Sequence, residues 1–371
     1  VIEDVEQVGS TTDNSPKLQT DSVGAIESFN LKRAMASRVF KSTDIYKHIY
    51  DRHETCVSHG ASEANLQEYV VCSKNPRHKE FVPVDEFTMQ DLPVSFRDDT
   101  IFRLVKLMFG FTVKIDVRMT SPLRPQYWEG STSSYPFYDL RNRCNVRMGS
   151  GSIRSLYKYT GGHNSEGRRH WNMYASCACR KCIESDSPSA TWWEIEVMTA
   201  THVVYDDTEA YHASCTMFYD GPGHAAVVLD TVVVDYANVE TDKCWLRCVT
   251  CDRTLAATME KMIQEFDQAW RSFHPNYQKS KYTDKLALTV SHPHGCTKQV
   301  SVGQWVDRIM LDGDENFSCY TYTTPTCPGT SGATVYVLGY HNGQRYMYSD
   351  HHVHSGVSKS GFNYCGNGYD L

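Results

Sequence analysis

The stretch that decides the fold is "TCPGTSGATVYVLG", which runs from Thr326 to Gly339. Ser331 lies there between small residues in a glycine-containing turn, and an alternating apolar run follows it. Glycine adopts the backbone conformations that tight turns need, and alternation of apolar residues is typical of a strand. The stretch therefore predicts a tight turn that leads into a β-strand. Whether the Ser331 hydroxyl has a chemical role depends on the side chains that the rest of the chain brings to it.

Short β-rich stretches separated by turn residues make up most of the chain from residue 148 onwards, as in "HAAVVLDTVVVDY" at 224–236. Many short strands of this kind predict a sandwich or a pair of barrels. One helix interrupts them at about residues 252–273, where apolar residues recur at helical spacing behind Asp252, a good N-cap. We therefore expect a mainly β domain over 148–371 with a helical insertion.

The first part of the chain has a different character. Residues 1–25 are polar and show no periodicity, so they predict a mobile tail. Residues 26–147 predict a separate, smaller region of mixed α/β type, with a helix over 98–110 and an alternating strand directly after it. This region contains no recognisable chemical motif, so the sequence leaves its role open.

Charge and hydropathy exclude some classes of partner. The 371-residue chain has a formal net charge of −7, which argues against a nucleic-acid partner held by a basic surface. It contains no apolar run of about 18 residues, so we expect no transmembrane helix and no membrane partner. The absence of a secretory signal and the clustering of the cysteines favour an intracellular location. The oligomeric state is not indicated.

Three cysteines form a C-x-C-x-x-C motif at Cys177, Cys179 and Cys182. Residues on one short loop rarely reach disulfide geometry with each other. Three thiolates in one loop, with a fourth from Cys215 on the following strand, would give Zn²⁺ the four soft ligands of a structural site. The alternative interpretation is free thiols or disulfides.

A serine hydroxyl becomes a useful nucleophile when a histidine takes its proton and a carboxylate orients that histidine. His202 lies where the alternating stretch "IEVMTATHVVYD" ends. Asp242 lies at the head of the strand-like stretch "ETDKCWLRCV". Together with Ser331 they give the chain order His, Asp, Ser, which is one of the known solutions.

Three other aspartates are alternatives to Asp242 as the orienting carboxylate. Asp230 and Asp235 lie on or near the preceding strand, with Asp235 at its end, and Asp252 suits the helix cap. Asp242 is preferred because it stands at the start of a strand.

These motifs resemble those of trypsin-like serine peptidases. "TATHVV" (199–204) is similar to the T-A-x-H strand end of that family, "DKCWLRCV" (242–249) to its aspartate strand, and "PGTSGA" (328–333) to its nucleophile turn. "LALTVSHPHGCTKQVSVGQW" (286–305) resembles a segment of the Deg/HtrA-type branch. The resemblance covers residues 148–371. It implies a chymotrypsin-like double six-stranded β-barrel with an inserted helix, preceded by the unrecognised mixed α/β region.

The resemblance also implies roles for single residues. Ser331 would be the nucleophile, His202 the general base and then acid, and Asp242 the residue that orients His202. The N–H groups of Gly329 and Ser331 would form the oxyanion hole. Pro325 stands six residues before Ser331, where trypsins place an aspartate in the specificity pocket, so no preference for Lys or Arg is implied.

Substrate binding is implied along one strand edge. The backbone of a protein or peptide substrate would pair with "HVHSGV" (352–357), and Ser355 and Gly356 would lie beside the specificity pocket. The function implied is a serine endopeptidase that works through a covalent acyl-enzyme and needs no cofactor for catalysis. Two alternatives stay open: a catalytically silent protein of this fold that acts as a binding or structural module, with its site blocked by residues 1–147, and a protease that cleaves only its own chain.

Overall fold

The computed structural model describes residues 40–41, 50–58, 66–69, 72–129, 131–221, 223–277, 283, 285–338 and 349–370. All of them belong to one compact unit, Phe40–Leu371. The predicted mobile tail at 1–25 lies outside the described residues. In the part that is described, no helix is both long enough and apolar enough to cross a membrane.

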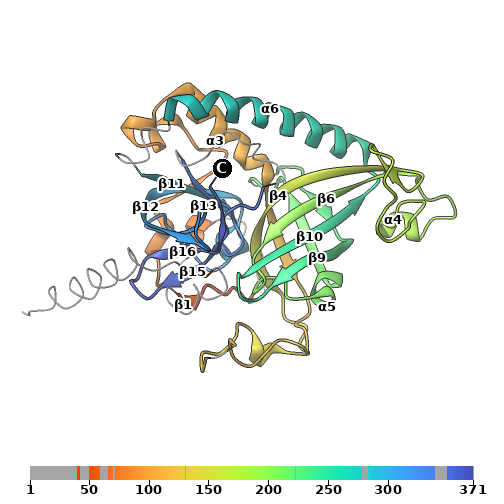
Figure 1. Cartoon of the computed structure of the whole chain (residues 1–371), viewed down its shortest axis with the longest axis horizontal. Coiled ribbons are helices and arrows are strands. Elements are labelled where there is room, and N and C mark those ends of the chain that lie inside the picture. The colour runs from red at the N-terminus through yellow and green to blue at the C-terminus, as the bar shows by residue number, and fades with distance from the viewer. Residues whose placement is uncertain are drawn as a thin grey trace, which may run out of the picture. The chain divides into compact units, whose positions relative to one another are not determined.

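The first of two antiparallel sheets has eight strands in the order β8-β7-β3-β4-β6-β10-β9, with β5 paired to β4 (Figure 1). Its strands are β3 Thr112–Val117, β4 Arg147–Thr160, β5 His163–Asn164, β6 Thr191–Thr199, β7 Ala213–Met217, β8 Val227–Leu229, β9 Val232–Asn238 and β10 Lys243–Thr250. Apolar residues alternate along β3, where Val113, Ile115 and Val117 are fully buried. This alternation is what made the strands visible in the sequence.

The second sheet has nine strands, ordered β1-β15-β16-β13-β12-β11-β14, with β17 on β13 and β2 on β12. Its strands are β1 Tyr50–His53, β2 Phe81–Pro83, β11 Leu286–Ser291, β12 Gln299–Leu311, β13 Asp314–Tyr322, β14 Val335–Val337, β15 His354–Ser358, β16 Asn363–Cys365 and β17 Gly368–Tyr369. Two of these strands, β1 and β2, come from the N-terminal part of the chain.

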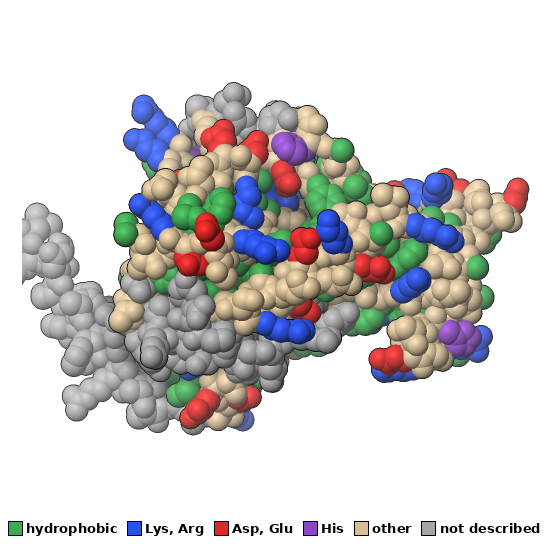
Figure 2. All heavy atoms as spheres, turned by 90° about the horizontal axis from the view of Figure 1, so that it is seen from above, with side chains coloured by type: hydrophobic (Ala, Val, Ile, Leu, Met, Phe, Trp, Pro, Cys, Tyr) green, Lys and Arg blue, Asp and Glu red, His purple; other side chains and the backbone are tan. Residues whose placement is uncertain are grey.

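Two longer helices, α3 (Asp99–Phe111) and α6 (Arg253–Tyr277), pack against each other beside the sheets (Figure 1). The Asp98 carboxylate accepts hydrogen bonds from the first N–H groups of α3, and the Asp252 carboxylate does the same for α6. On the face that carries α6, basic and acidic side chains are interspersed (Figure 2). The short helices are α4 Arg180–Ile183, α5 Asp207–Tyr211, η1 Leu66–Glu68, η2 Pro76–His78, η3 Met89–Asp91, η4 Val94–Phe96, η5 Tyr138–Leu140 and η7 Pro293–Gly295.

The mainly β architecture with two β units and one long inserted helix is confirmed. The division of the chain at residues 147 and 148 differs from the structure, because that boundary falls inside the compact unit. Strand β3 pairs with both β4 and β7, so it is an inner strand of the first sheet. The helix and strand read as a separate mixed α/β region therefore complete the β domain.

Candidate active site

His202 and Asp242 meet at one end of the first sheet. Strand β6 ends at Thr199 and β10 begins at Lys243, and Cys244 lies opposite Thr199 in the antiparallel pairing. The residues just beyond these strand ends are therefore neighbours. The Nδ1–H of His202 donates to Asp242 Oδ2 at 2.7 Å, and the His202 backbone N–H donates to Oδ1 at 2.9 Å. Both oxygens of the carboxylate thus hold one histidine, with Nε2 facing away.

The Asp242 carboxylate stays charged although it is buried. Burial alone would raise the pKa of Asp242, but the neighbouring rings of His202 and His53 and the hydrogen bonds from His202 lower it below the usual value. The other three aspartates have partners elsewhere. Asp235 pairs with Arg247, Asp230 pairs with Arg180, and Asp252 caps α6.

The turn that carries Ser331 needs a glycine both before and after the serine. Gly329 has φ +98° and Gly332 has φ +86°, and both values fall in the region that residues with a side chain avoid. A Cβ on Gly329 would come within 2.6 Å of the His292 carbonyl oxygen. The turn is also fixed to the first sheet, because the Ser150 N–H donates to the Ser331 carbonyl at 2.8 Å. This bond ties the turn that carries Ser331 to strand β4, which pairs with β6, the strand that leads to His202.

The Ser331 hydroxyl is only 1% exposed and is already engaged. It donates to the carbonyl oxygen of Glu54 at 2.7 Å. His202 Nε2 is buried and has no hydrogen-bond partner. The N–H groups of Gly329 and Ser331, which the sequence suggested as oxyanion donors, do not donate to this carbonyl.

A segment from the N-terminal part of the chain covers the site. Strand β1 pairs antiparallel with β15, so that Arg52 lies opposite Val357 and His53 opposite Gly356. This edge is the one on which the sequence predicted substrate pairing. A Cβ on Gly356 would collide with the Arg52 carbonyl, so glycine is needed for the close approach of the two strands.

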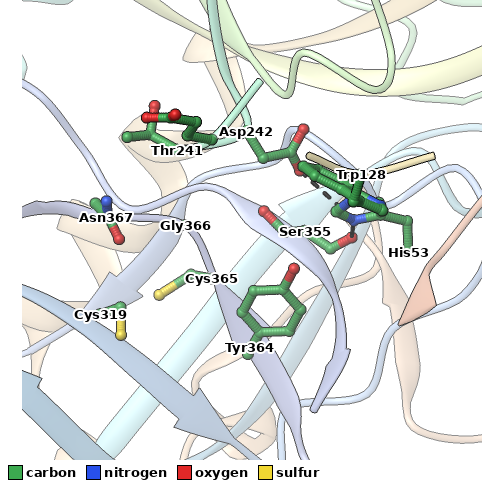
Figure 3. A pocket seen from close by; sticks show the side chains of 11 residues that line it. His53, Trp128, Thr241, Asp242, Cys319, Ser355, Tyr364, Cys365, Gly366 and Asn367 are labelled. Carbon is green, nitrogen blue, oxygen red and sulfur yellow. Dashed lines mark hydrogen bonds and ion pairs between the residues drawn. The ribbon is translucent and has the colours of Figure 1, made fainter. Parts of the chain in front are cut away.

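His53 lies directly on the histidine of the site. Its ring stacks on that of His202, with centroids 4.3 Å apart and planes 14° apart. Its Nδ1 lies 2.9 Å from the Ser355 carbonyl oxygen and 3.6 Å from Asp242 Oδ2, and Trp128 packs beside it (Figure 3). Burial and the nearby His202 lower the pKa of His53 to about 3, so its ring is neutral at pH 7.

Two of the three predicted substrate-binding residues contact the covering segment, and the third is hydrogen-bonded elsewhere. Gly356 and the Ser355 carbonyl contact the β1 segment, whereas the Pro325 carbonyl accepts a hydrogen bond from the Ser301 hydroxyl. The next residue, Thr326, is the one whose hydroxyl reaches the Glu54 carboxylate, at 3.2 Å.

A buried ionic cluster that sequence reasoning missed supports the His202 turn. Arg124 makes two hydrogen bonds to the Glu209 carboxylate, at 2.7 and 2.8 Å, and Arg147 pairs with the same carboxylate at 2.8 Å. The two guanidinium groups then donate to the backbone carbonyls of His202 and Val203, each at 3.0 Å. These side chains are at most 1% exposed. No local motif marks them, because their partners lie far apart in the sequence.

Replacing Glu209 with Gln is expected to lower the free energy of unfolding by about 3–5 kcal/mol, because two buried guanidinium groups lose their counter-charge. Burial alone would raise the pKa of Glu209, but Arg124 and Arg147 lower it from 4.5 to about 2. Its contribution is therefore complete above pH 4.5 and is lost as the pH falls towards 2. Denaturant unfolding at pH 7 and pH 3 measures both effects.

The matched control is Glu265→Gln on α6, where the carboxylate is exposed and lies 3.8 Å from Lys261. This change is expected to cost less than about 0.5 kcal/mol. A Glu209→Gln protein as stable as the control would contradict the role given to the cluster.

The cysteines of the C-x-C-x-x-C loop come together with Cys251. The sulfur atoms of Cys177, Cys179, Cys182 and Cys251 all lie within 4.8 Å of one another. Cys251 Sγ is 3.7 Å from Cys179 Sγ and 3.6 Å from Cys182 Sγ. A tetrahedral zinc with Zn–S bonds of about 2.3 Å holds its sulfurs about 3.8 Å apart, so these separations suit a Cys₄ site.

Cys215, which the sequence suggested as the fourth ligand, is not part of this group. It lies within β7, whose neighbours in the sheet are β3 and β8 rather than β6, and it is fully buried in the core. Cys251 follows the end of β10, and this end pairs with the start of β6, directly after the cysteine loop. Sheet order, which the sequence did not reveal, decides the fourth member.

We propose that these four thiolates bind one structural Zn²⁺. Replacing Cys251 with Ser is expected to remove one zinc per chain and to destabilise the cysteine loop, whereas Cys215→Ser is expected to leave the zinc content unchanged. Elemental analysis of the purified full-length chain measures the zinc content of each variant. Equal zinc content in wild type and Cys251→Ser would contradict the site.

The comparisons with known proteins give structural matches only. No protein-family model matches this sequence. The curated proteins give no significant match either. The HtrA-type protease AlgW with a decapeptide is similar in structure, with 10% identity and a TM-score of 0.35 over 71% of this chain and 63% of that chain. The present chain therefore spans less than two thirds of that protein's length.

Two further solved structures are similar to the same extent. The active form of the Rv3671c protease from M. tuberculosis has 13% identity and a TM-score of 0.32, over 74% of this chain and 82% of that chain. The serine endoprotease from Yersinia pestis has 12% identity and a TM-score of 0.32, over 74% of this chain and 62% of that chain.

Proposed function

We propose that the chain is a serine endopeptidase in which Ser331, His202 and Asp242 act together on a protein or peptide substrate. The observation that supports this most is the contact at Ser331. Its hydroxyl lies 2.7 Å from a backbone carbonyl oxygen of a segment that crosses the site, while the paired His202 and Asp242 lie beneath that segment. This supports the proposal because a serine peptidase needs its hydroxyl at a peptide carbonyl and a histidine–aspartate pair close to it.

The proposed mechanism uses Nε2 of His202 as the base. As Ser331 Oγ bonds to the carbonyl carbon, Nε2 takes its proton, and the charged Asp242 stabilises the imidazolium that forms. His202 then protonates the leaving amine, which leaves an acyl-enzyme on Ser331. A water molecule that loses its proton to His202 hydrolyses this ester, and no cofactor takes part. The zinc proposed above has a structural role only.

The oxyanion would be stabilised by the turn that carries the nucleophile. When the carbonyl carbon becomes tetrahedral, its oxygen moves away from the Ser331 hydroxyl, which has lost its proton. The N–H groups of Gly329 and Ser331 are the donors we propose for the new position of this oxygen. The positive φ of Gly329 permits the backbone orientation that such a donor pair needs.

A fluorophosphonate probe tests the proposal, because it reacts with activated serines without needing a particular side chain in the specificity pocket. We expect slow labelling of the wild-type chain at Ser331, none in Ser331→Ala, and labelling at least about 10³-fold slower in His202→Ala. Slow labelling of wild type is expected because the β1 segment covers the serine. Intact-mass spectrometry with peptide mapping measures the extent of labelling and its site.

The variant Glu54→Lys separates a covered site from a silent one. It places a positive charge beside Lys74 and should release the segment from Ser331. If neither the wild type nor this variant is labelled although both are folded, the endopeptidase proposal is wrong. The protein would then be a catalytically silent binding or structural module.

A further inference from the structure

The covering segment lies across the site in the manner of a substrate, on both sides of Ser331. Before Glu54, strand β1 forms an antiparallel pair with β15. After it, the Cys56 carbonyl accepts a hydrogen bond from the Met148 N–H at 3.0 Å, and the Ser58 N–H donates to the Val146 carbonyl at 2.8 Å. The peptide bond that follows the Glu54 carbonyl is therefore held from both ends, with that carbonyl at the serine hydroxyl.

The Glu54 side chain fills a pocket built for a carboxylate. His354 Nε2 lies 2.9 Å from Glu54 Oε2, the Thr326 hydroxyl lies 3.2 Å from Oε1, and Lys74 Nζ forms an ion pair with Oε1. Lys74 also donates to the Thr326 hydroxyl at 2.7 Å and to Asn363 Oδ1 at 2.9 Å, which holds its ammonium group in place. Because Glu54 is only 7% exposed, its charge needs the compensation that these partners provide.

The hydrogen bonds of His354 fix which atom of the pocket donates. The Glu54 carboxylate can only accept, so Nε2 of His354 carries the proton that points to it, and Nδ1 of the neutral ring accepts from the Tyr322 hydroxyl at 2.6 Å. Burial, with the nearby Lys74 and His202, keeps the pKa of His354 well below its usual value, so the ring is neutral. The pocket thus offers two neutral donors and one cation, a set that matches a carboxylate better than an amide or an apolar side chain.

We propose that residues 50–58 are this enzyme's own substrate, that the Glu54–Thr55 bond is the one cleaved, and that the pocket selects glutamate on the acyl side. This inference rests on the proposed function. It assigns a substrate class to the same site: peptides in which glutamate precedes the cleaved bond. It also explains why Gly356 lies under Arg52, since only glycine lets a bound strand approach so closely.

The cleavage balances as an ordinary hydrolysis. Ser331 Oγ bonds to the Glu54 carbonyl carbon and gives its proton to His202, and the bond from that carbon to the Thr55 nitrogen breaks as His202 returns the proton to the nitrogen. Water then bonds to the carbon as it gives a proton to His202, and the Ser331 ester bond breaks as His202 returns that proton to Ser331 Oγ. The products are a fragment that ends with the Glu54 carboxylate and a fragment that begins with a free Thr55 amine.

The new N-terminus is the direct test. The purified full-length chain is incubated, and its fragments are measured by mass spectrometry in wild type, Ser331→Ala and Glu54→Gln. We expect Thr55 as the new terminus in wild type, with a first-order rate that does not change over a 100-fold dilution. We expect no cleavage in Ser331→Ala, and a rate about 10- to 100-fold lower in Glu54→Gln, because the amide loses the charged contact with Lys74. The control is Glu86→Gln, an exposed glutamate outside the site.

Peptides in trans test the preference separately. The cleaved enzyme is given "YDRHETCVS", the sequence of residues 50–58, and versions with Gln or Leu in place of the glutamate. Cleavage after glutamate at least about 10-fold faster than after glutamine supports the pocket. Probe labelling of Ser331 without a Thr55 terminus, or with equal rates for the three peptides, overturns this inference while leaving the endopeptidase intact. If neither the wild type nor Glu54→Lys is labelled, the endopeptidase proposal and this inference are both wrong.

A second cluster of soft ligands lies behind the nucleophile turn and carries an independent inference. The donor atoms of Cys72, His78, His294 and Cys327 all lie within 4.8 Å of one another. The two sulfurs are 3.6 Å apart, too far for a disulfide and close to the spacing of two thiolates on one zinc.

The ring nitrogens in this cluster that lack hydrogen-bond partners point to a bound metal ion. Nε2 of His294 and both ring nitrogens of His78 are buried without a hydrogen bond of normal geometry. The Asn75 backbone N–H contacts Cys72 Sγ at 3.4 Å, and its side-chain amide contacts Cys327 Sγ at 3.1 Å. Donors of this kind commonly surround metal-bound thiolates.

The geometry points to a second structural Zn²⁺, bound by two cysteines and two histidines, which ties the segment containing Lys74 to the turn containing Ser331. Elemental analysis of the full-length chain is expected to give two zinc ions for wild type, one for Cys72→Ser, one for Cys251→Ser and none for the double variant. In the Cys251→Ser background, Co²⁺ substitution should give the weaker thiolate absorption of a site with two sulfurs. Two zinc ions retained in Cys72→Ser, or a Cys72–Cys327 disulfide in the purified protein, would overturn this inference.

Discussion

Asp242→Asn is expected to lower kcat for peptide hydrolysis by about 10⁴-fold while leaving the fold intact. The asparagine oxygen can still accept from the His202 backbone N–H, as Oδ1 does now at 2.9 Å. Its NH₂ group then faces Nδ1 at the position of the present 2.7 Å hydrogen bond. Nδ1 must become the acceptor, so the proton moves to Nε2. A protonated Nε2 cannot take the proton of Ser331.

The matched control for this variant is Asp235→Asn, which removes a carboxylate on β9 that is 25% exposed and pairs with Arg247 at 2.9 Å. We expect its kcat to stay within about two-fold of wild type. Thermal unfolding of both variants checks that the fold is retained. If Asp242→Asn kept its kcat within ten-fold of wild type, Asp242 would not orient the base, and another carboxylate would have to be sought.

The positions of His202 and Asp242 could be predicted because local pattern determines strand ends. Alternating apolar residues marked β6 and β10, and the two polar side chains stood just outside them. Antiparallel pairing of neighbouring strands then brings such ends together. The Ser331 turn was predictable for a similar reason, since Gly329 and Gly332 mark backbone that other residues avoid.

The covering segment could not be predicted from the sequence. Strand β1 is four residues long and has only His53 buried along it, so it has no alternating pattern. Its conformation depends on two partners that are distant in the sequence. Strand β15 follows it by hundreds of residues, and Trp128 follows it by tens of residues. Lys74 belongs to a short basic run that resembles an ordinary solvated surface. Its role depends on Glu54, and no local rule links the two.

Partners that are far apart in the sequence also explain the other contacts that the sequence did not reveal. Arg124 and Glu209 are 85 residues apart, and each alone would be read as a surface charge. Cys251 was overlooked as a zinc ligand because strand order, not chain order, places it beside the cysteine loop. In both cases the contact is decided by residues far apart in the sequence, which no local pattern links.

His354→Leu is expected to reduce cleavage at Glu54–Thr55, and kcat/KM for the glutamate peptide, by about 10³- to 10⁴-fold. A site built to hydrogen-bond a polar group discriminates strongly when one partner is lost, because the remaining polar groups are buried and unpaired. Here both the Glu54 carboxylate and the Tyr322 hydroxyl lose their contact with the ring. Labelling of Ser331 by the fluorophosphonate should persist, because the probe does not use the pocket.

A second buried histidine of the same region supplies the control. His352 lies two residues away and is hydrogen-bonded to the carbonyl of Ser318 at 3.0 Å, with no contact to Glu54. His352→Leu therefore removes an equally buried ring while leaving the carboxylate pocket unchanged. Its cleavage rate is expected within about ten-fold of wild type, with the glutamate preference retained. If both variants lost cleavage equally, the effect of His354 would be one of general stability, and the selection of glutamate would have to come from Lys74 and Thr326 alone.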